Sequence, residues 1–545
     1  MNTGQVNLLV FREDRRRVSG SELMSALASE MESCGPPGHR LRALLRAGEL
    51  ECGVADAAPE LLANWERVTD KLADALISRE SSRPGDDSAL LRQAEPPPYL
   101  HISKPEGFAY YGLHPLAYAA VLGELGPLPP CVALIGIRSV GTTLSAIMAA
   151  AARRRGLNAA RITVRPTGHP YNRHTIFSPP QLAWVQESLG ASAAFLVVDE
   201  GPGLSGSSFL SVAEALVEAG APAEKITLIC GHEPELKSLC SDNGPQRASR
   251  FRWVAVDNQP RVPDGAEVFI GGGEWRRSSF AEEQDWPASW TSLERLKYLS
   301  PAEGGERQLF KFAGFGHYGD AVIEREREAA EAGFGPITVC DCEGFAVYPW
   351  LHVPPMRAGD LSQRVLSRLA EYCAFRAQAF PSGTADLDSL QQMAEHNLNE
   401  LGHDLPVTLR LARPIISDGR MQPHEWLLAA DGRMLKTDSG SHGDDHFFPG
   451  PTDIAWDLAG AIVEWKMNED QAEFFLESYR RASGDDPVPR IGDFITAYTV
   501  FRSSYCLMAA NSTQGSDEQL RLERAADCCK AMLPARTSPL IASKR

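Results

Sequence analysis

The stretch AAFLVVDEGPGLSGSSFLSVAEALVEAG, residues 193–220, decides the fold that we predict for the N-terminal half of the chain. It opens with an unbroken apolar run at 193–198, which suits a strand covered on both faces. Asp199 and Glu200 follow, and then a turn rich in Gly and Ser. Apolar residues after the turn recur at helical spacing as far as Gly220, a residue typical of helix ends. The stretch therefore predicts a strand, an anion-sized loop and the start of a helix.

The loop in this stretch has the composition of a phosphate-binding site. The N–H groups of a first helical turn have no partner within the helix, and together with serine hydroxyls they favour a bound anion. Asp199 and Glu200, at the rim of the loop, would hold ribose hydroxyls or a metal. The alternative is an ordinary turn in which a serine caps the helix and no ligand binds. The residues that we expect around the anion are Ser205, Gly206, Ser207 and Ser208.

This pattern resembles the PRPP-binding signature of the type I phosphoribosyltransferases, in which an apolar strand, two acidic residues and a short spacer precede Thr/Ser-Gly-x-Thr/Ser. The spacer here is one residue longer than usual, and the first Thr is a Ser. The resemblance implies transfer of a phosphoribosyl group between PRPP, held with Mg²⁺, and a small nitrogenous acceptor, or the reverse reaction. The matching residues are Asp199, Glu200, Ser205, Gly206, Ser207 and Ser208.

A second loop, in IGIRSVGTTL at 135–144, lies at the end of another predicted strand and just before a predicted helix. The phosphoribosyltransferase resemblance implies that this loop holds the pyrophosphate. The alternative is a tight turn that carries a surface arginine. The resemblance assigns pyrophosphate binding to Arg138, Ser139, Gly141 and Thr142, and catalytic roles to Arg138, Asp199 and Glu200.

A third stretch, VRPTGHPYNRH at 164–174, contains basic side chains in a segment that we expect to be an exposed connection. In the resembled family a mobile loop at this place closes over the transition state. The resemblance gives this role to Arg165, His169 and Arg173. The alternative is a solvated loop that happens to be basic.

The composition is that of an ordinary folded protein with several domains. The length of 545 residues suggests about three domains, and contents of 43% apolar and 23% charged residues are normal. A net charge of −17 argues against nucleic acid and anionic membranes as general partners. The 11 cysteines, without C-x-x-C spacing, are typical of reduced thiols, and no apolar run is long enough to cross a bilayer. We therefore expect a cytoplasmic protein.

Alternating apolar runs and amphipathic segments from 99 to 257 predict an α/β domain with a mainly parallel sheet and flanking helices. Leucines at spacings of three and four before residue 78 predict helices there. The expected organisation is a helical segment at 1–78, a linker at 79–98, the phosphoribosyltransferase-like domain at 99–257, a bridge or substrate hood at 258–292, a second domain at 293–533 and a tail at 534–545.

The second domain opens with LFKFAGFGHYGDAVIEREREAAEAGFGP at 309–336, which predicts a strand bearing Lys311, a Gly-rich turn and an acidic helix. Further on, PHEWLLAADGRMLKTD at 423–438 predicts two strands joined by an Asp-Gly hairpin turn. The stretch ends at Asp438. TDIAWDLAGAI at 452–462 then predicts the beginning of a buried helix.

This order of elements resembles the aminoglycoside phosphotransferases, a branch of the protein-kinase-like fold, and implies a two-lobed α+β domain that binds ATP and Mg²⁺. The resemblance implies that Lys311 holds the α- and β-phosphates of ATP, because phosphoryl transfer requires positive charge there. Glu324 or a neighbour would pair with Lys311, and residues 348–351 would face adenine. Asp438 would bind the metal, and Asp457 would be the buried acid of the W-D-L-A segment.

Some positions depart from the pattern of that family. Glu425 stands where the family has a metal-binding Asn, and a glutamate still binds Mg²⁺. Arg420 stands at the catalytic base, and an arginine accepts no proton. Asp418, two residues upstream, would serve as the base only if the loop is rebuilt. The sequence therefore leaves the kinase activity of this domain open.

The loop SHGDDHFFPG at 441–450 has two alternative interpretations. His442, Asp444, Asp445 and His446 are all metal-ligand types, but the two histidines do not lie on a predicted helix, where their spacing would favour a zinc pair. A solvated acidic loop is the preferred interpretation.

Functions of different classes are compatible with these motifs. The first is a PRPP-dependent phosphoribosyltransferase for a small base-like acceptor, fused to an atypical ATP-dependent small-molecule kinase-like domain. The second is a regulatory protein that senses nucleotides by binding PRPP or ATP without turnover. A third, a small-molecule phosphotransferase whose first domain has no catalytic role, requires Asp418 to reach the substrate. The oligomeric state stays open, with a homodimer as one alternative.

Overall fold

The computed structural model describes residues 7–12, 15–32, 37–78, 91, 93–257, 262–301, 306–338, 340–342, 344–443 and 445–533. The chain divides into two compact units. The N-terminal unit contains residues 14–261 and 314–318, and the C-terminal unit contains residues 1–13, 262–313 and 319–545. Most of the predicted linker, Asp444 and the predicted tail lie outside the described residues. Within the described ranges, no helix has the length and apolar character to cross a membrane.

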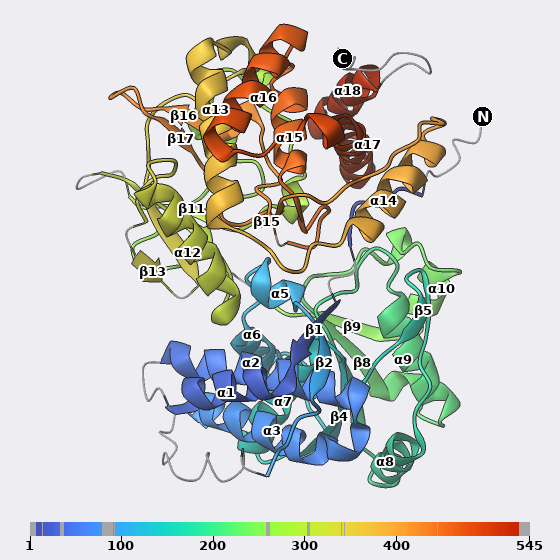
Figure 1. The fold of residues 1–545 in the computed structure, drawn as a ribbon. Helices are drawn as coiled ribbons and strands as arrows, with labels where there is room; N and C mark the ends of the chain where they lie inside the picture. Colours follow the sequence, from blue (N-terminus) through green and yellow to red (C-terminus); the bar gives the residue numbers. More distant parts are fainter. Residues whose placement is uncertain are drawn as a thin grey trace. The chain divides into compact units, whose positions relative to one another are not determined.

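A five-stranded parallel sheet lies at the centre of the N-terminal unit (Figure 1), so the prediction of a parallel sheet is confirmed. Its strands in spatial order are β4 (Asn158–Val164), β3 (Cys131–Ile137), β7 (Ala194–Val198), β8 (Ile226–Cys230) and β9 (Arg252–Ala255). The chain passes from β3 outward to β4, returns past β3 to β7 and continues to β8 and β9. Sheets of this kind bind ligands outside the carboxyl ends of the strands where the direction reverses, here between β3 and β7.

Helices cover both faces of this sheet. α8 (Pro179–Gly190) and α9 (Ser207–Glu218) share a core with every second residue of the central strands, among them Ile135 and Phe195. The intervening strand residues are also buried, and since alternate residues of a strand point to opposite faces, they face α7 (Val140–Arg154). This double cover explains why the strands are apolar without interruption.

The N-terminal helices belong to the same unit as the sheet. α1 (Gly20–Glu32) packs on α2 (Pro37–Ala57), α2 packs on α3 (Leu62–Ser78), and both α2 and α3 contact α7. A buried ion pair fixes α2 to β4, because the guanidinium of Arg161 donates two hydrogen bonds to the carboxylate of Glu51, at 2.6 and 2.8 Å.

Shorter elements complete the N-terminal unit. Their bounds are β1 (Arg15–Ser19), β2 (Tyr99–Ser103), α5 (Glu106–Ala109), α6 (Pro115–Val121), β5 (Thr167–His169), β6 (Asn172–His174) and α10 (Gly244–Ala248), with 3-10 turns at Pro59–Leu61, Ala223–Lys225 and Leu236–Ser238. β1 pairs antiparallel with β2. β5 and β6 form an antiparallel hairpin in the stretch predicted as a basic loop.

The C-terminal unit contains a five-stranded antiparallel sheet (Figure 1). Its strands in spatial order are β10 (Val268–Phe269), β11 (Lys297–Leu299), β12 (Gln308–Phe312), β14 (Phe345–Pro349) and β13 (Cys340–Cys342). β10 comes from the stretch predicted as a bridge, so this stretch forms part of the sheet. α12 (His317–Glu331) follows β12, and its residues Val322 and Ile323 share a small core with Ala346.

Helices and two short two-stranded sheets make up the rest of the C-terminal unit. The helices are α11 (Trp275–Ser279), α13 (Gln363–Ala379), α14 (Leu387–Glu400), α15 (Ala455–Glu464), α16 (Glu469–Ser483), α17 (Val488–Ser512) and α18 (Asp517–Met532), with 3-10 turns at Glu283–Asp285, Thr291–Leu293, Ala358–Asp360 and Pro423–Glu425. β15 (Pro414–Ile416) pairs with β18 (Pro451–Asp453), and β16 (Trp426–Leu428) pairs with β17 (Met434–Lys436). The predicted Asp-Gly hairpin and the predicted buried helix, α15, are both confirmed.

Candidate functional site

Lys311 and Asp438 meet inside the C-terminal unit. Lys311 lies in β12, and its ammonium group contacts a carboxylate oxygen of Asp438, two residues beyond β17. The same ammonium lies 3.2 Å from the hydroxyl oxygen of Ser441. Burial lowers the pKa of Lys311 well below its ordinary value, and the charge of Glu326 opposes that shift. Two residues predicted to hold phosphates and metal are therefore side by side.

The backbone at Asp438 has an uncommon conformation, with φ at 63° in the left-handed region. Residues other than glycine are seldom found there, and they persist where the surroundings fix them, often at functional sites. Ser441 donates a hydrogen bond to the Asp438 carboxylate, and the N–H of Gly440 donates to Glu326 at 2.7 Å. The turn that carries Asp438 is thus held on both sides.

The sequence predicted Glu324 or a neighbour as the partner of Lys311, and the glutamate of α12 that faces this centre is Glu326, not Glu324. Glu326 is buried and accepts hydrogen bonds from the Ser439 hydroxyl and the Gly440 N–H. The side chain of Glu324 is 62% exposed and lies 3.5 Å from Arg327. The reason is helical period: Val322 and Glu326, one turn apart, share the buried face of α12, and Glu324 points away from it.

Glu425 lies beside Lys436, with 2.6 Å between the carboxylate Oε2 and the ammonium Nζ. Burial alone would raise the pKa of Glu425, but the charge of Lys436, followed by His442, overcomes this effect and lowers the pKa to about 2. Glu425 therefore stays ionised. A carboxylate in this state can serve as a metal ligand, as the sequence predicted.

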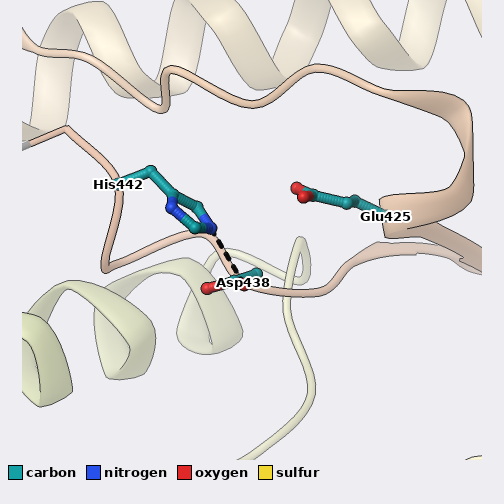
Figure 2. Close-up of side chains that lie close together, drawn as sticks. All are labelled: Glu425, Asp438 and His442. Atoms are coloured by element: carbon teal, nitrogen blue, oxygen red, sulfur yellow. Dashed lines mark ion pairs between the residues drawn. The ribbon is translucent and has the colours of Figure 1, made fainter. Parts of the chain in front are cut away.

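Glu425, Asp438 and His442 form the cluster that we call the metal-ligand cluster. Their ligand atoms all lie within 4.8 Å of one another, and the three side chains point toward a common centre (Figure 2). The imidazole Nε2 of His442 lies 2.9 Å from Asp438 Oδ2. Two carboxylates and one imidazole are a donor set that fits a divalent cation.

Asp418 is buried beside Lys436, the residue that pairs with Glu425. It is 1% exposed, accepts a hydrogen bond from the Tyr372 hydroxyl, and lies 3.5 Å from the Lys436 ammonium. Its own N–H and that of Gly419 donate to the buried carboxylate of Asp457, at 2.8 and 3.0 Å. Buried groups therefore hold Asp418, and its assignment as the catalytic base, which requires a rebuilt loop, stays a prediction.

The described residues of the loop at 441–450 are buried, except His442, which is partly buried, so the preferred interpretation as a solvated acidic loop is wrong. Asp445, His446 and Phe447 are each less than 9% exposed. Asp445 accepts a hydrogen bond from the Phe447 N–H at 2.9 Å and lies 3.6 Å from Nδ1 of His442. Phe447 belongs to the main core of the C-terminal unit, which explains why the loop is drawn inward.

In the N-terminal unit, the loops that follow β3 and β7 lie against each other. A Cβ on Gly141 would come within 2.4 Å of the carbonyl oxygen of Val198, so only glycine allows this approach. The N–H of Gly141 donates to the carboxylate of Asp199. Burial raises the pKa of Asp199 to about 7 and raises that of Glu200 well above its ordinary value. The two predicted ligand loops therefore meet where the sheet reverses direction.

The loop after β3 has a strained backbone at Ser139, and protein groups hold the side chain of Arg138. Ser139 has φ at 107°, a value that a non-glycine residue rarely adopts. The guanidinium of Arg138 lies 2.9 Å from the Asp56 carboxylate and 3.3 Å from the Thr163 hydroxyl. The side chain of Thr142 is wholly buried, and among the described residues its hydroxyl oxygen has no hydrogen-bond partner, so its assignment as a pyrophosphate contact stays a prediction. Arg138 would have to leave Asp56 to reach a ligand.

The loop that carries Ser205, Ser207 and Ser208 contacts the β5–β6 hairpin. The hydroxyls of Ser205 and Ser207 both donate to the carbonyl oxygen of Pro170, at 2.9 and 2.6 Å. Gly206 has φ at 66° and precedes α9, and Ser208, in the first turn, is half-buried. The hairpin carbonyl thus occupies two of the three serine hydroxyls that were predicted to bind phosphate.

Other predicted residues around these loops also have protein partners. Glu200 accepts a hydrogen bond from the Gly107 N–H at 2.8 Å. Arg165 lies 2.6 Å from Asp56, and Arg173 donates to the Gly168 carbonyl at 2.8 Å. Asp56 therefore joins two of the predicted basic groups, Arg138 and Arg165, to α2.

Sequence reasoning missed several residues of these sites. Lys436 had a local signal, because it stands in an apolar strand two residues before Asp438. Residues two positions apart in an extended chain point to the same side. Glu326 was detectable from the helical period of α12. Asp56 and Pro170 had no local signal, because each acts on a segment distant in the sequence.

Comparisons with protein-family models found no match, and a search of curated proteins also found none. Among solved structures, the chain is similar to the choline kinase LicA from Streptococcus pneumoniae, with 14% identity, a TM-score of 0.30, and coverage of 43% of this chain and 90% of that one. It is also similar to a choline/ethanolamine kinase family protein from Mesorhizobium loti, with 18% identity, a TM-score of 0.30, and coverage of 48% and 95%. A third is the macrolide 2'-phosphotransferase MphH from Brachybacterium faecium, with 13% identity, a TM-score of 0.29, and coverage of 46% and 96%.

Proposed function

We propose that the C-terminal unit binds ATP together with a divalent cation and transfers the terminal phosphoryl group to a small molecule. The observation that carries this proposal is the contact of Lys311 with Asp438 beside the metal-ligand cluster. A lysine and a metal site at this separation supply positive charge along a polyphosphate, which is the main requirement of phosphoryl transfer. Mg²⁺ is the cation that the sequence predicted.

The roles of the residues follow from their charges. Lys311 would leave Asp438 and hold the phosphates, while Asp438 and Glu425 would hold the cation. The cation, when bound, neutralises charge on the phosphate oxygens. Glu326 fixes the turn that carries Asp438, through Ser439 and Gly440.

A catalytic base is not essential to this proposal. Phosphoryl transfer passes through a loose transition state, and enzymes assist it mainly by positioning and electrostatics. Arg420, at the position of the base in the resembled family, lies with its guanidinium 5.1 Å from the ring centre of Tyr505. We infer that it supplies positive charge near the acceptor instead of removing a proton.

The test is calorimetry with ATP and Mg²⁺, followed by ³¹P NMR of the reaction with a panel of small alcohols and amino alcohols. Lys311→Met should abolish ATP binding. Glu326→Gln should weaken it by about ten-fold or more, since hydrogen bonds to a charged group contribute about 1.5–3 kcal/mol. Glu324→Gln, an exposed glutamate on the same helix, is the matched control and should bind as the native protein does.

The outcomes separate the candidate functions. Binding of ATP with phosphoryl transfer supports the kinase. Binding without transfer to any acceptor, and without release of phosphate, favours the alternative of a nucleotide sensor. Failure of the native protein to bind ATP would refute both for this unit.

A second function is proposed for the N-terminal unit, namely binding of PRPP and transfer of its phosphoribosyl group to a small nitrogenous acceptor. The supporting observation is that Asp199 and Glu200 follow β7 where the sheet reverses direction, beside the strained loop at Ser139. Calorimetry with PRPP and Mg²⁺ should show binding that Asp199→Asn removes. Glu200→Gln should abolish turnover in an enzyme but leave a sensor's response to PRPP intact.

A further inference from the structure

His442 lies in the metal-ligand cluster in a position that a second carboxylate fixes. Its Nε2 lies 2.9 Å from Asp438, and its Nδ1, on the other side of the ring, lies 3.6 Å from Asp445. Asp445 is itself held, because one of its oxygens accepts the Phe447 N–H. The imidazole is therefore fixed between two carboxylates, Asp438 within the cluster and Asp445 outside it.

This arrangement matches the surroundings of a metal-binding histidine. Such a histidine usually directs its second ring nitrogen toward a carboxylate, which holds the proton on that nitrogen and leaves the other nitrogen with a lone pair for the metal. Asp445 takes the position of that carboxylate here. Nε2 of His442 is shielded from solvent and, among the described residues, makes no hydrogen bond of acceptable geometry. Its lone pair would face the carboxylate of Asp438, which is unfavourable unless a cation lies between them.

The two carboxylates of the cluster also have supporting partners. Lys436 lies 2.6 Å from Glu425, and Ser441 donates to Asp438. Each of the three ligand groups thus has a neighbour that fixes its orientation, as the ligands of real metal centres do. An acidic cluster formed by chance on a surface would lack these neighbours.

We propose that His442 is a third metal ligand beside Glu425 and Asp438, and that the cluster therefore selects a divalent transition ion such as Mn²⁺ over Mg²⁺. Mg²⁺ is bound by oxygen ligands and accepts nitrogen reluctantly, whereas imidazole suits the first-row transition ions and Mn²⁺ also suits carboxylates. The inference rests on the proposed metal-dependent phosphotransferase centre, and it names the cation of that centre.

The experiment uses the full chain and Mn²⁺ alone, without nucleotide. Electron spin-echo modulation of bound Mn²⁺ should show coupling to an imidazole ¹⁴N nucleus. Competition between the two ions should show that Mn²⁺ binds about ten-fold or more tightly than Mg²⁺. His442→Gln should remove the ¹⁴N signal and most of the preference for Mn²⁺. His352→Ala, which removes an exposed histidine of the same unit, is the control and should change neither.

Two results would overturn the inference. One is bound Mn²⁺ without a ¹⁴N signal in the native protein, a measurement that needs no variant to fold. The other is an unchanged ratio of Mn²⁺ to Mg²⁺ affinity in His442→Gln. The proposal of a phosphotransferase is tested separately. A protein that binds Mn²⁺ through His442 but neither binds nor uses ATP would support the metal site and refute the kinase activity.

Discussion

The ammonium of Lys436 lies 2.6 Å from the carboxylate of Glu425, and the Lys436 side chain is wholly buried. Glu425 stands where the resembled phosphotransferases have a neutral asparagine. Lys436 carries the opposite charge, so the pair of Glu425 and Lys436 has no net charge, as an asparagine side chain has none. A glutamate at this position is therefore compatible with the proposed metal centre.

Removal of Lys436 should destabilise the C-terminal unit. Lys436→Met leaves Glu425 with Asp418 nearby and no buried cation between them, and breaking a buried pair in this way costs about 3–5 kcal/mol. The free energy of unfolding, measured by urea denaturation, should fall by that amount.

The double variant Lys436→Met with Glu425→Gln is the control for this pair. It removes both charges, so its stability should recover to within about 2 kcal/mol of the native protein if the cost arises from an unpaired charge. A double variant as unstable as Lys436→Met alone would show that packing, and not charge, explains the loss.

Much of the N-terminal fold was predictable because its signals are local. Apolar runs covered on both faces predict buried parallel strands, and Gly-rich turns after them predict loops at one edge of the sheet. The order of strands was not predictable, since it depends on which runs pair across the sheet. The buried pair of Arg161 with Glu51, which fixes α2 to β4, joins residues 110 positions apart.

The candidate sites were predicted less completely, for a related reason. Motif spacing identified Lys311 and Asp438, which the structure brings together, but it did not distinguish Glu326 from Glu324, for which the helical period of α12 was needed. Asp418 was chosen for its place in the sequence, yet its carboxylate is held by Tyr372 of α13. Burial decides such cases, and burial depends on contacts with distant segments.

Asp199 should make the stability of the N-terminal unit depend on pH. Burial raises its pKa from 3.8 to about 7, so the folded protein keeps a proton that the unfolded chain releases. Between these two values, the folded state binds more protons, and stability falls as the pH rises. Asp199→Asn should flatten this dependence between about pH 4 and pH 7, as followed by thermal unfolding. Parallel curves for variant and native protein would contradict the assignment.

Binding of PRPP should loosen the β5–β6 hairpin. The hydroxyls of Ser205 and Ser207 donate to Pro170, and they cannot donate to a phosphate at the same time. Hydrogen exchange of residues 167–174 should therefore accelerate on addition of PRPP. The double variant Ser205→Ala with Ser207→Ala should exchange quickly without ligand and should not respond to PRPP. Slower exchange in the native protein with PRPP would show instead that the hairpin closes over the ligand.

Asp56 should compete with pyrophosphate for Arg138. Its carboxylate lies 2.9 Å from Arg138 and 2.6 Å from Arg165, so it holds both guanidinium groups near α2. Asp56→Asn weakens both ion pairs, and we expect the affinity for PRPP, measured by calorimetry, to rise several-fold. Arg138→Gln should lower it.

The matched control for this prediction is Asp74→Asn. Asp74 lies 3.0 Å from Arg153 and forms a similar pair, which is exposed to solvent, so its loss should leave PRPP affinity unchanged. If Asp56→Asn weakens PRPP binding as much as Arg138→Gln does, then Asp56 positions Arg138 for the ligand and does not compete with it. In that case α2, from the segment predicted only as helical, is part of the binding site.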